Sequence, residues 1–247
     1  MKIDLTGKTA VVTGGNSGIG RAFSLGLARA GANVVATYFS SDFEPFVKNE
    51  QAISGMALDA TDSEEVDAVM ANAAEKLGGK IDILINNAGG LLGRVLIADM
   101  SDEHFHKVMN VNFSSTFYCT RAVLPYMPDG GRIVNLSSLA AHNGGGNGSV
   151  LYAASKGAVI SFTRGMAKEL GTRHITVNAL APGFIANTAF HDTFTPEAVQ
   201  KANVSQTPVQ RAGTADDVAA AALYLVSDMG SFITGEVMEI NGGLYFV

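Results

Sequence analysis

Short apolar runs rich in β-branched residues alternate along the chain with longer segments whose apolar residues recur at helical spacing. The runs "KTAVVT" and "NVVATYF" are typical of strands, and "GIGRAFSLGLARAG" between them is typical of a helix that ends at Gly31. The run "IDILINN" is almost continuously apolar, which is expected of a strand in a sheet that is covered on both faces. The pattern therefore favours a parallel sheet.

The same alternation continues to the end of the chain and predicts about seven strands with helices between them. The strands are expected at 8–13, 33–39, 55–60, 81–87, 131–138, 174–181 and 235–242, and the main helices at 18–31, 63–77, 102–125, 152–170 and 215–227. The chain has no linker rich in proline, glycine or serine between them. Residues 1–247 are therefore expected to form one α/β domain, a doubly wound parallel sheet with helices on both faces.

Composition narrows the class of partner. Hydrophobic residues make up 47% of the chain and charged residues 16%, which fits a well-buried core. A net charge of −6 and the lack of a basic stripe argue against nucleic acid or an anionic membrane as the partner. The single cysteine, Cys119, and the lack of a signal peptide or of a bilayer-length apolar run lead us to expect a cytoplasmic protein.

The turn after the first predicted strand is "TGGNSGIG", from Thr13 to Gly20. Gly14, Gly18 and Gly20 allow a tight turn whose backbone N–H groups can approach a phosphate closely. The helix that follows adds the partial positive charge of its N-terminus. Because these glycines stand between a predicted strand and a predicted helix, they indicate a dinucleotide site.

Further motifs follow at set places along the chain. "NNAG" (86–89) follows the fourth predicted strand, and "YAASK" places Tyr152 and Lys156 four residues apart, on one side of a helix. With T-G-x-x-x-G-I-G at 13–20, these motifs resemble the short-chain dehydrogenase/reductase family. The match extends through "APG" (181–183) to "NGG" (241–243). The resemblance implies a single-domain Rossmann fold that transfers a hydride between a nicotinamide dinucleotide and a carbonyl or alcohol.

The resemblance also implies the catalytic residues. Tyr152 would be the general acid/base, and Lys156 would support it and hold the nicotinamide ribose. A phenol has a pKa of about 10, and a neighbouring ammonium together with a positively charged nicotinamide would lower that pKa toward working pH. Ser138 would hydrogen-bond the substrate oxygen, with Ser137 as the second candidate, and Asn112 would order a water behind the lysine.

The residues expected around the cofactor follow from the same resemblance. Asp59 would lie near the adenine, Asn86 on the adenosine side, and Pro182 in the turn above the nicotinamide. Asn187 stands where the family usually has a threonine, so Thr188 is predicted to take that role. The expected cofactor-binding residues are Gly14, Asn16, Ser17, Gly18, Ile19, Gly20, Tyr38, Asp59, Ala60, Asn86, Ala88, Gly89, Tyr152, Lys156, Pro182, Gly183, Ile185 and Thr188.

The end of the second predicted strand bears on the choice of cofactor. Enzymes that prefer NAD usually carry an acidic residue there, whereas this chain has Tyr38, which does not repel a 2′-phosphate. Ser17 stands where many NADP enzymes carry a basic residue, and Ser40, Ser41 or Lys48 are candidate contacts for the phosphate. We expect NADP(H) to be favoured, with NAD(H) as the alternative.

Segment 183–210 is expected to cover the active site and to set the substrate. Its stretch "TAFHDTFT" favours a small polar carbonyl, such as a keto-sugar acid of the uronate type. The chain is also similar to 3-oxoacyl-carrier-protein reductases, which makes a 3-oxoacyl thioester the alternative. His142 and His191 fall in loops beside the expected pocket. No two histidines have the spacing of metal ligands, so no metal is expected.

Other functions remain open at this point. A catalytically silent dinucleotide sensor typically lacks the tyrosine or the lysine, and both are present here. Non-redox chemistry through transient oxidation, such as epimerisation, would use the same residues. The helices that contain Cys119 and Ser161, and the apolar C-terminal "LYFV", resemble the interfaces of family members that form homotetramers, so a homotetramer is implied.

Overall fold

One parallel sheet forms the centre of the molecule. The computed structural model describes residues 3–40, 51–188 and 193–247. The strands are joined in the order β3-β2-β1-β4-β5-β6-β7, every neighbouring pair parallel, which confirms the predicted doubly wound sheet. Their bounds are β1 (Thr9–Val12), β2 (Asn33–Tyr38), β3 (Ile53–Ala57), β4 (Ile83–Asn86), β5 (Arg132–Leu136), β6 (Thr176–Pro182) and β7 (Val237–Ile240).

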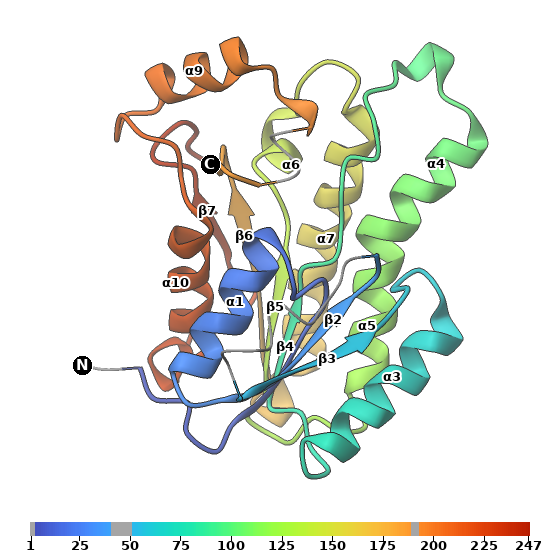
Figure 1. Cartoon of the computed structure of the whole chain (residues 1–247), viewed down its shortest axis with the longest axis vertical. Coiled ribbons are helices and arrows are strands. Elements are labelled where there is room, and N and C mark those ends of the chain that lie inside the picture. The colour runs from blue at the N-terminus through green and yellow to red at the C-terminus, as the bar shows by residue number, and fades with distance from the viewer. Residues whose placement is uncertain (1–2, 41–50, 189–192) are drawn as a thin grey trace.

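Helices cover both faces of the sheet (Figure 1). The helices α1 and α10 pack on one face, and α3, α5 and α7 pack on the other. None of the described helices is both long and apolar enough to cross a membrane. The helix bounds are α1 (Gly18–Arg29), α3 (Ser63–Lys76), α4 (Asp102–Met109), α5 (Ser115–Val123), α6 (Ala140–Asn143), α7 (Val150–Glu169), α9 (Glu197–Gln206) and α10 (Ala215–Val226), with the π-helical turn η2 (Asn110–Ser114) and the 3₁₀ turns η1 (Ile97–Asp99), η3 (Gly171–Arg173) and η4 (Asp228–Gly230).

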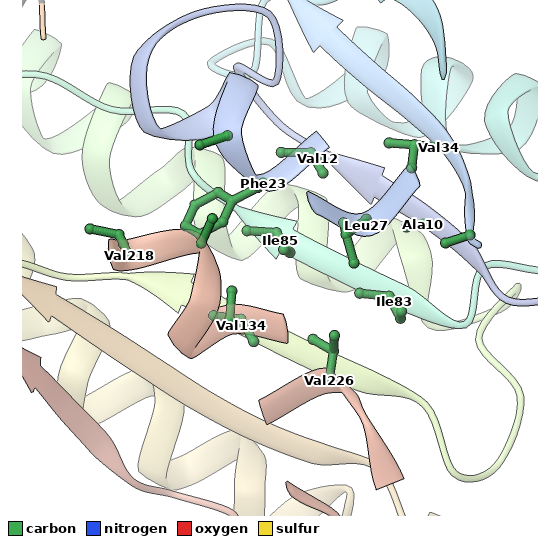
Figure 2. Packing of buried hydrophobic residues seen from close by; sticks show 14 of the residues in the cluster. Ala10, Val12, Phe23, Leu27, Val34, Ile83, Ile85, Val134, Val218 and Val226 are labelled. Carbon is green, nitrogen blue, oxygen red and sulfur yellow. The ribbon is translucent and has the colours of Figure 1, made fainter. Parts of the chain in front are cut away.

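The core has two layers because successive strand residues point to opposite faces. On β1, Ala10 and Val12 pack toward α1 and α10, whereas Val11 packs toward α3 and α5. All three side chains are fully buried, which explains why the central strands are apolar on both faces. Figure 2 shows the first layer, with Ala10, Val12, Phe23, Leu27, Val34, Ile83, Ile85, Val134, Val218 and Val226 labelled.

Several elements differ from those predicted. The helix expected over 102–125 is α4 and α5, joined by the π-helical turn η2. The third strand begins at Ile53 instead of residue 55, and α3 is capped by Asp62, whose carboxylate accepts two backbone N–H bonds. The short helix α6 follows β5 where a loop was expected, and α9 lies inside segment 183–210.

The order of the strands positions a site at one edge of the sheet. It reverses between β1 and β4, since β2 and β3 lie on one side of β1 and β5 to β7 lie beyond β4. In sheets of this kind the loops at the carboxyl ends of β1 and β4 separate and leave a crevice. The glycine turn follows β1 and "NNAG" begins at the end of β4, so both motifs lie at this crevice.

Candidate active site

A cavity of about 780 Å³ opens at the carboxyl edge of the sheet. Its volume lies within the range of ligand pockets, roughly 300–1,000 Å³. The glycine turn, the ends of β2 to β5, the first turn of α7 and the turn after β6 all contribute to its walls. The sequence-predicted residues that line it are Gly14, Asn16, Ser17, Gly18, Ile19, Gly20, Tyr38, Ser40, Asp59, Ala60, Ala88, Gly89, Ser137, Ser138, Tyr152, Lys156, Pro182, Gly183, Ile185 and Thr188.

The glycine turn has a shape that side chains would destroy. Gly14 and Gly18 have φ angles of +59° and +49°, in the left-handed region that glycine adopts without strain. A Cβ atom on Gly20 would collide with the carbonyl oxygen of Gly14. Ser17, the N-cap of α1, makes no side-chain capping bond. The first residues of the helix therefore line the cavity with backbone N–H groups that the Ser17 side chain does not cap. This cradle fits the diphosphate of a dinucleotide.

The two asparagines of "NNAG" point in different directions, and this corrects one prediction. Asn86, expected on the adenosine side, is 3% exposed, does not line the cavity, and donates to Thr120 Oγ1 (2.9 Å) and Asn135 Oδ1 (2.8 Å). Asn87 lines the cavity instead and donates to the carbonyl of Thr13 (2.9 Å). Side chains alternate at a strand end, so only one of two neighbours can face the crevice.

Lys156 is a buried cation beside the predicted acid. It is 3% exposed, and Nζ donates to the carbonyl of Leu136 at 2.7 Å. Nζ lies 5.9 Å from the centre of the Tyr152 ring. A Cβ on Gly89 would lie 3.1 Å from Nζ, so the absence of a side chain there leaves room for the lysine. Burial lowers the pKa of Lys156 from 10.5 to about 8, which brings its titration close to neutral pH.

Tyr152 is half-buried on the cavity wall, one helical turn before the lysine. Burial raises the pKa of its phenol above 10.0, and a hydrogen bond with Ser138 acts in the opposite direction but is weaker. Burial of the phenol is the larger effect in the protein itself. The lowering expected from Lys156 together with a positively charged nicotinamide stays a prediction. The phenol therefore stays protonated at neutral pH.

The structure distinguishes the two candidate serines. Ser137 is 2% exposed and donates its hydroxyl to the carbonyl of Lys156 (2.9 Å), which occupies its proton. Ser138 accepts from the N–H of Ala140 (3.2 Å) and hydrogen-bonds Tyr152, so its hydroxyl lies beside the phenol. Ser138, the first choice from sequence, is the serine that lies next to Tyr152.

Asn112 lies behind the cavity wall. It is completely buried in the π-helical turn, and its Nδ2 donates to the carbonyls of Gly90 (2.8 Å) and Val108 (2.9 Å). Its Oδ1 accepts from the N–H of Gly90 at 3.0 Å. A Cβ on Gly89 would come within 2.8 Å of this oxygen and 3.1 Å of the lysine ammonium. Asn112 therefore ties the loop after β4 to the helix and lies near Lys156 without lining the cavity.

Other predicted contacts have local partners. Asp59 Oδ1 accepts from the N–H (2.9 Å) and the hydroxyl (2.7 Å) of Thr61, which orders the turn after β3. Thr188 donates its hydroxyl to the carbonyl of Ile185 (3.0 Å) and is 7% exposed. Both residues still line the cavity. They shape its wall through these bonds.

Several lining residues were not predicted. Most of them stand next to a predicted residue at the end of a strand. The predicted strand ends could therefore have identified them as lining residues. These residues are Thr37, Phe39, Leu58, Thr61, Asn87, Gly90, Leu92, Lys107, Asn110, Val111 and Leu136.

Some sequence candidates lie elsewhere. His142 does not line this cavity: its Nε2 lies 2.9 Å from Oε1 of Glu239, although the two atoms are not aligned as a hydrogen bond. Cys119 is buried, and burial raises its pKa to about 12, so it is an unreactive core thiol. The candidates Ser41, Lys48 and His191 lie outside the described residues.

The fold and this cavity define a dinucleotide-binding α/β protein, and comparisons give its family. A family model described as enoyl-(acyl carrier protein) reductase matches residues 14–245. The 3-oxoacyl-(acyl-carrier-protein) reductase of Thermotoga maritima is 39% identical over 247 residues, covering 97% of this chain and 98% of the relative. The 7alpha-hydroxysteroid dehydrogenase of Escherichia coli is 38% identical over 246 residues, covering 97% and 94%.

A solved structure shows the same fold. The crystal structure of a short chain dehydrogenase from Burkholderia cenocepacia in complex with NADP is 36% identical, with a TM-score of 0.90, and covers 97% of this chain and 98% of that one. The chain belongs to the short-chain dehydrogenase/reductase family, which confirms the resemblance in its motifs. It is therefore an NAD(P)-dependent oxidoreductase.

Proposed function

We propose that the protein is an NADP(H)-dependent carbonyl reductase and that its substrate is a 3-oxoacyl thioester. One observation carries the reaction type: the glycine cradle and the group formed by Ser138, Tyr152 and Lys156 line the same cavity. Similarity over nearly the whole length to a 3-oxoacyl-(acyl-carrier-protein) reductase supports the substrate class. In this proposal residues 1–247 act as one cofactor-binding and catalytic unit.

The cofactor preference rests on the end of β2. The cavity wall there is formed by Tyr38, Phe39 and Ser40, none of which carries a carboxylate that would repel a 2′-phosphate. The similarity to a structure in complex with NADP supports the same choice. The glycine cradle would hold the diphosphate, Asp59 and Ala60 the adenosine end, and Lys156 the nicotinamide ribose. When bound, the nicotinamide supplies the hydride.

The chain itself manages the proton. The Oη atom of Tyr152 is the proton donor to the carbonyl oxygen, and the raised pKa of the phenol keeps that proton in place at neutral pH. Ser138 Oγ, hydrogen-bonded to the phenol, orients the carbonyl oxygen. The ammonium of Lys156 stabilises the phenolate after transfer, which the low-dielectric surroundings strengthen. A protonated tyrosine suits reduction better than oxidation.

Turnover of a small panel tests the substrate class. We would follow oxidation of NADPH and NADH with an acetoacetyl thioester and with a keto-sugar acid, and follow the reverse reaction with a hydroxysteroid, because the E. coli relative bears a steroid name. Selective NADPH oxidation with the thioester is the expected result. The keto-sugar acid suggested by segment 183–210 has no support from the relatives, and selective turnover of it would overturn the thioester assignment.

The variant Tyr152→Phe tests the mechanism. It removes Oη and leaves the ring, so kcat is expected to fall at least about 100-fold while NADPH still binds. A near-normal rate would refute the role of Tyr152. Tight NADPH binding without turnover of any carbonyl would point to the dinucleotide sensor, and turnover without net change of cofactor absorbance would point to epimerisation.

The cytoplasmic location and the homotetramer implied by the family resemblance belong to this proposal as well. On the described surface, Phe117 of α5 is 38% exposed, and Phe246 and Val247 at the C-terminus are 81% and 79% exposed. Exposed apolar side chains of this size favour a subunit interface. Light scattering coupled to size exclusion would measure the mass, and a monomer at micromolar concentration would contradict the tetramer.

A further inference from the structure

A second cavity of about 700 Å³ is lined in part by residues that lie close in sequence to those lining the catalytic one. Two chain segments line both cavities in succession. Leu92 lines the first cavity and Arg94, two residues later, lines the second. On segment 183–210, Thr188 lines the first and Thr193 the second. The stretch from Leu92 to Arg94 therefore runs from the wall of one cavity to the wall of the other.

The third wall of the second cavity is the glycine-rich loop that leads into α7. Gly146, Asn147 and Gly148 line it, and α7 carries Tyr152 in its first turn. A Cβ on Gly148 would lie 3.0 Å from Cβ of Arg94, so the glycine allows the loop and the arginine to pack closely. The second cavity thus adjoins the position where a substrate carbonyl would meet Tyr152.

Arg94 is fixed in this cavity by two backbone carbonyls. Its Nη1 donates to the carbonyl of Asn147 (2.9 Å) and its Nε to the carbonyl of Phe194 (3.2 Å). A Cβ on Gly146 would lie 3.2 Å from Nη1, so the glycine leaves room for the guanidinium. Among the described residues the guanidinium has no other hydrogen-bond partner, so both Nη2 hydrogens and the second Nη1 hydrogen of its five N–H donors remain available there.

The charge of Arg94 has no carboxylate partner among the described residues, whereas Arg121, Arg173 and Arg211 each pair with an aspartate. The remaining walls are largely apolar, with Leu96, Phe194, Pro196 and Val199. An elongated, mostly uncharged ligand that ends in an anion matches such a cavity. A guanidinium also binds phosphate and carboxylate in a two-pronged geometry that an ammonium does not reproduce.

We propose that the second cavity binds the non-reacting end of the substrate and that Arg94 binds an oxyanion on that end. The oxyanion has two chemical sources: the phosphate of a phosphopantetheine thioester or the carboxylate of a keto acid. The first source rests on the proposed function, and the second does not. Arg94 is then a specificity-determining residue with no part in the proton transfer.

Binding of matched charged and neutral ligands tests this site without turnover. Titration calorimetry of the NADP⁺-loaded protein would compare 4′-phosphopantetheine with pantetheine, and a ketogluconate with its methyl ester. The wild type is expected to prefer the charged member of one pair about tenfold, which corresponds to one charge-assisted contact. In Arg94→Gln that preference falls to about one, and Arg94→Lys retains part of it because the charge remains.

The control is Arg29→Gln, an exposed arginine at the end of α1 that lines neither cavity, and it should leave the preference unchanged. The preference should also fall as salt rises, since the Arg94 side chain is exposed. Equal weakening of charged and neutral ligands in Arg94→Gln would show that the arginine only fixes the two loops. Such a result, or no preference in the wild type for either charged ligand, would overturn the proposal.

Failure of the proposed function gives a different result. If the protein does not reduce thioesters but prefers the keto acid to its ester through Arg94, the thioester assignment fails and the anion site stands. If thioesters are reduced and neither pair shows a preference that depends on Arg94, the anion site fails and the thioester assignment stands.

Discussion

Replacing Lys156 with Met should stabilise the protein at neutral pH while it removes activity. Burial lowers the pKa of this lysine from 10.5 to about 8, and each pKa unit corresponds to 1.36 kcal/mol. Keeping Lys156 charged in the folded protein at pH 7 therefore costs roughly 3 kcal/mol. Methionine removes that cost and loses the bond to the Leu136 carbonyl, worth about 1–2 kcal/mol, so a net gain of about 1–2 kcal/mol is expected.

The pH dependence gives a sharper test than the gain itself. Between pH 8 and 10.5 the unfolded chain binds a proton at Lys156 that the folded protein does not, so wild-type stability rises with pH in this window. The stability advantage of Lys156→Met over the wild type should shrink by roughly 2 kcal/mol from pH 7 to pH 10.

Urea unfolding at one protein concentration would measure the free energy of unfolding at both pH values. The control is Lys168→Met, an exposed lysine of the same helix, whose difference from the wild type should stay within about 0.5 kcal/mol at both. The reasoning would be refuted if Lys156→Met were less stable than the wild type at pH 7 and the difference in free energy of unfolding did not change with pH. Burial of the ammonium would then not destabilise the folded protein.

Three further outcomes are expected. Gly20→Ala should weaken NADPH binding at least about tenfold in a fluorescence titration, because its Cβ would meet the carbonyl oxygen of Gly14. Gly18→Ala has open space around its Cβ but a φ of +49°, so it should cost only about 1–2 kcal/mol of stability in a thermal melt. Asn112→Ala should lower the free energy of unfolding by about 2–4 kcal/mol, because buried backbone groups lose their partners; a change below 0.5 kcal/mol in urea unfolding would contradict this. Burial raises the pKa of Asp82, but hydrogen bonds including that from Lys80 outweigh this effect, so the pKa is lowered overall. The stability that Asp82 contributes should therefore be present above pH 3.8 and lost as pH falls through the lowered pKa. In Asp82→Asn the free energy of unfolding should not show this loss in acid.

The sequence was most informative where a motif needs a special backbone. The glycines after β1 were predicted to form a phosphate cradle, and two of them do have left-handed φ angles. Tyr152 and Lys156 were placed together because a helix brings residues four apart to one side. The alternating apolar runs predicted the parallel sheet because each run is buried on both faces. These features depend on local chain geometry alone.

The rest depended on tertiary packing. Which asparagine of "NNAG" faces the crevice follows from where β4 ends, and the sequence places strand ends only within a few residues. The pKa of Tyr152 depends on how deeply the phenol is buried and on its hydrogen bond with Ser138, and neither appears in the spacing of Tyr152 and Lys156. The second cavity is formed by segments some fifty residues apart, Arg94, the loop at 146–148 and Phe194, so no local pattern could indicate it.

The π-helical turn at Asn110–Ser114 limits how the length of the chain can change. The turn adds one residue between α4 and α5, and within it Asn112 donates its side-chain N–H to the carbonyl of Val108. Deleting one residue there would restore a continuous helix but rotate α5 by about 100° relative to α4. Cys119 and Val123 would then leave the core. A deletion of one residue from this turn should therefore destabilise the protein more than a deletion of one residue from a surface loop.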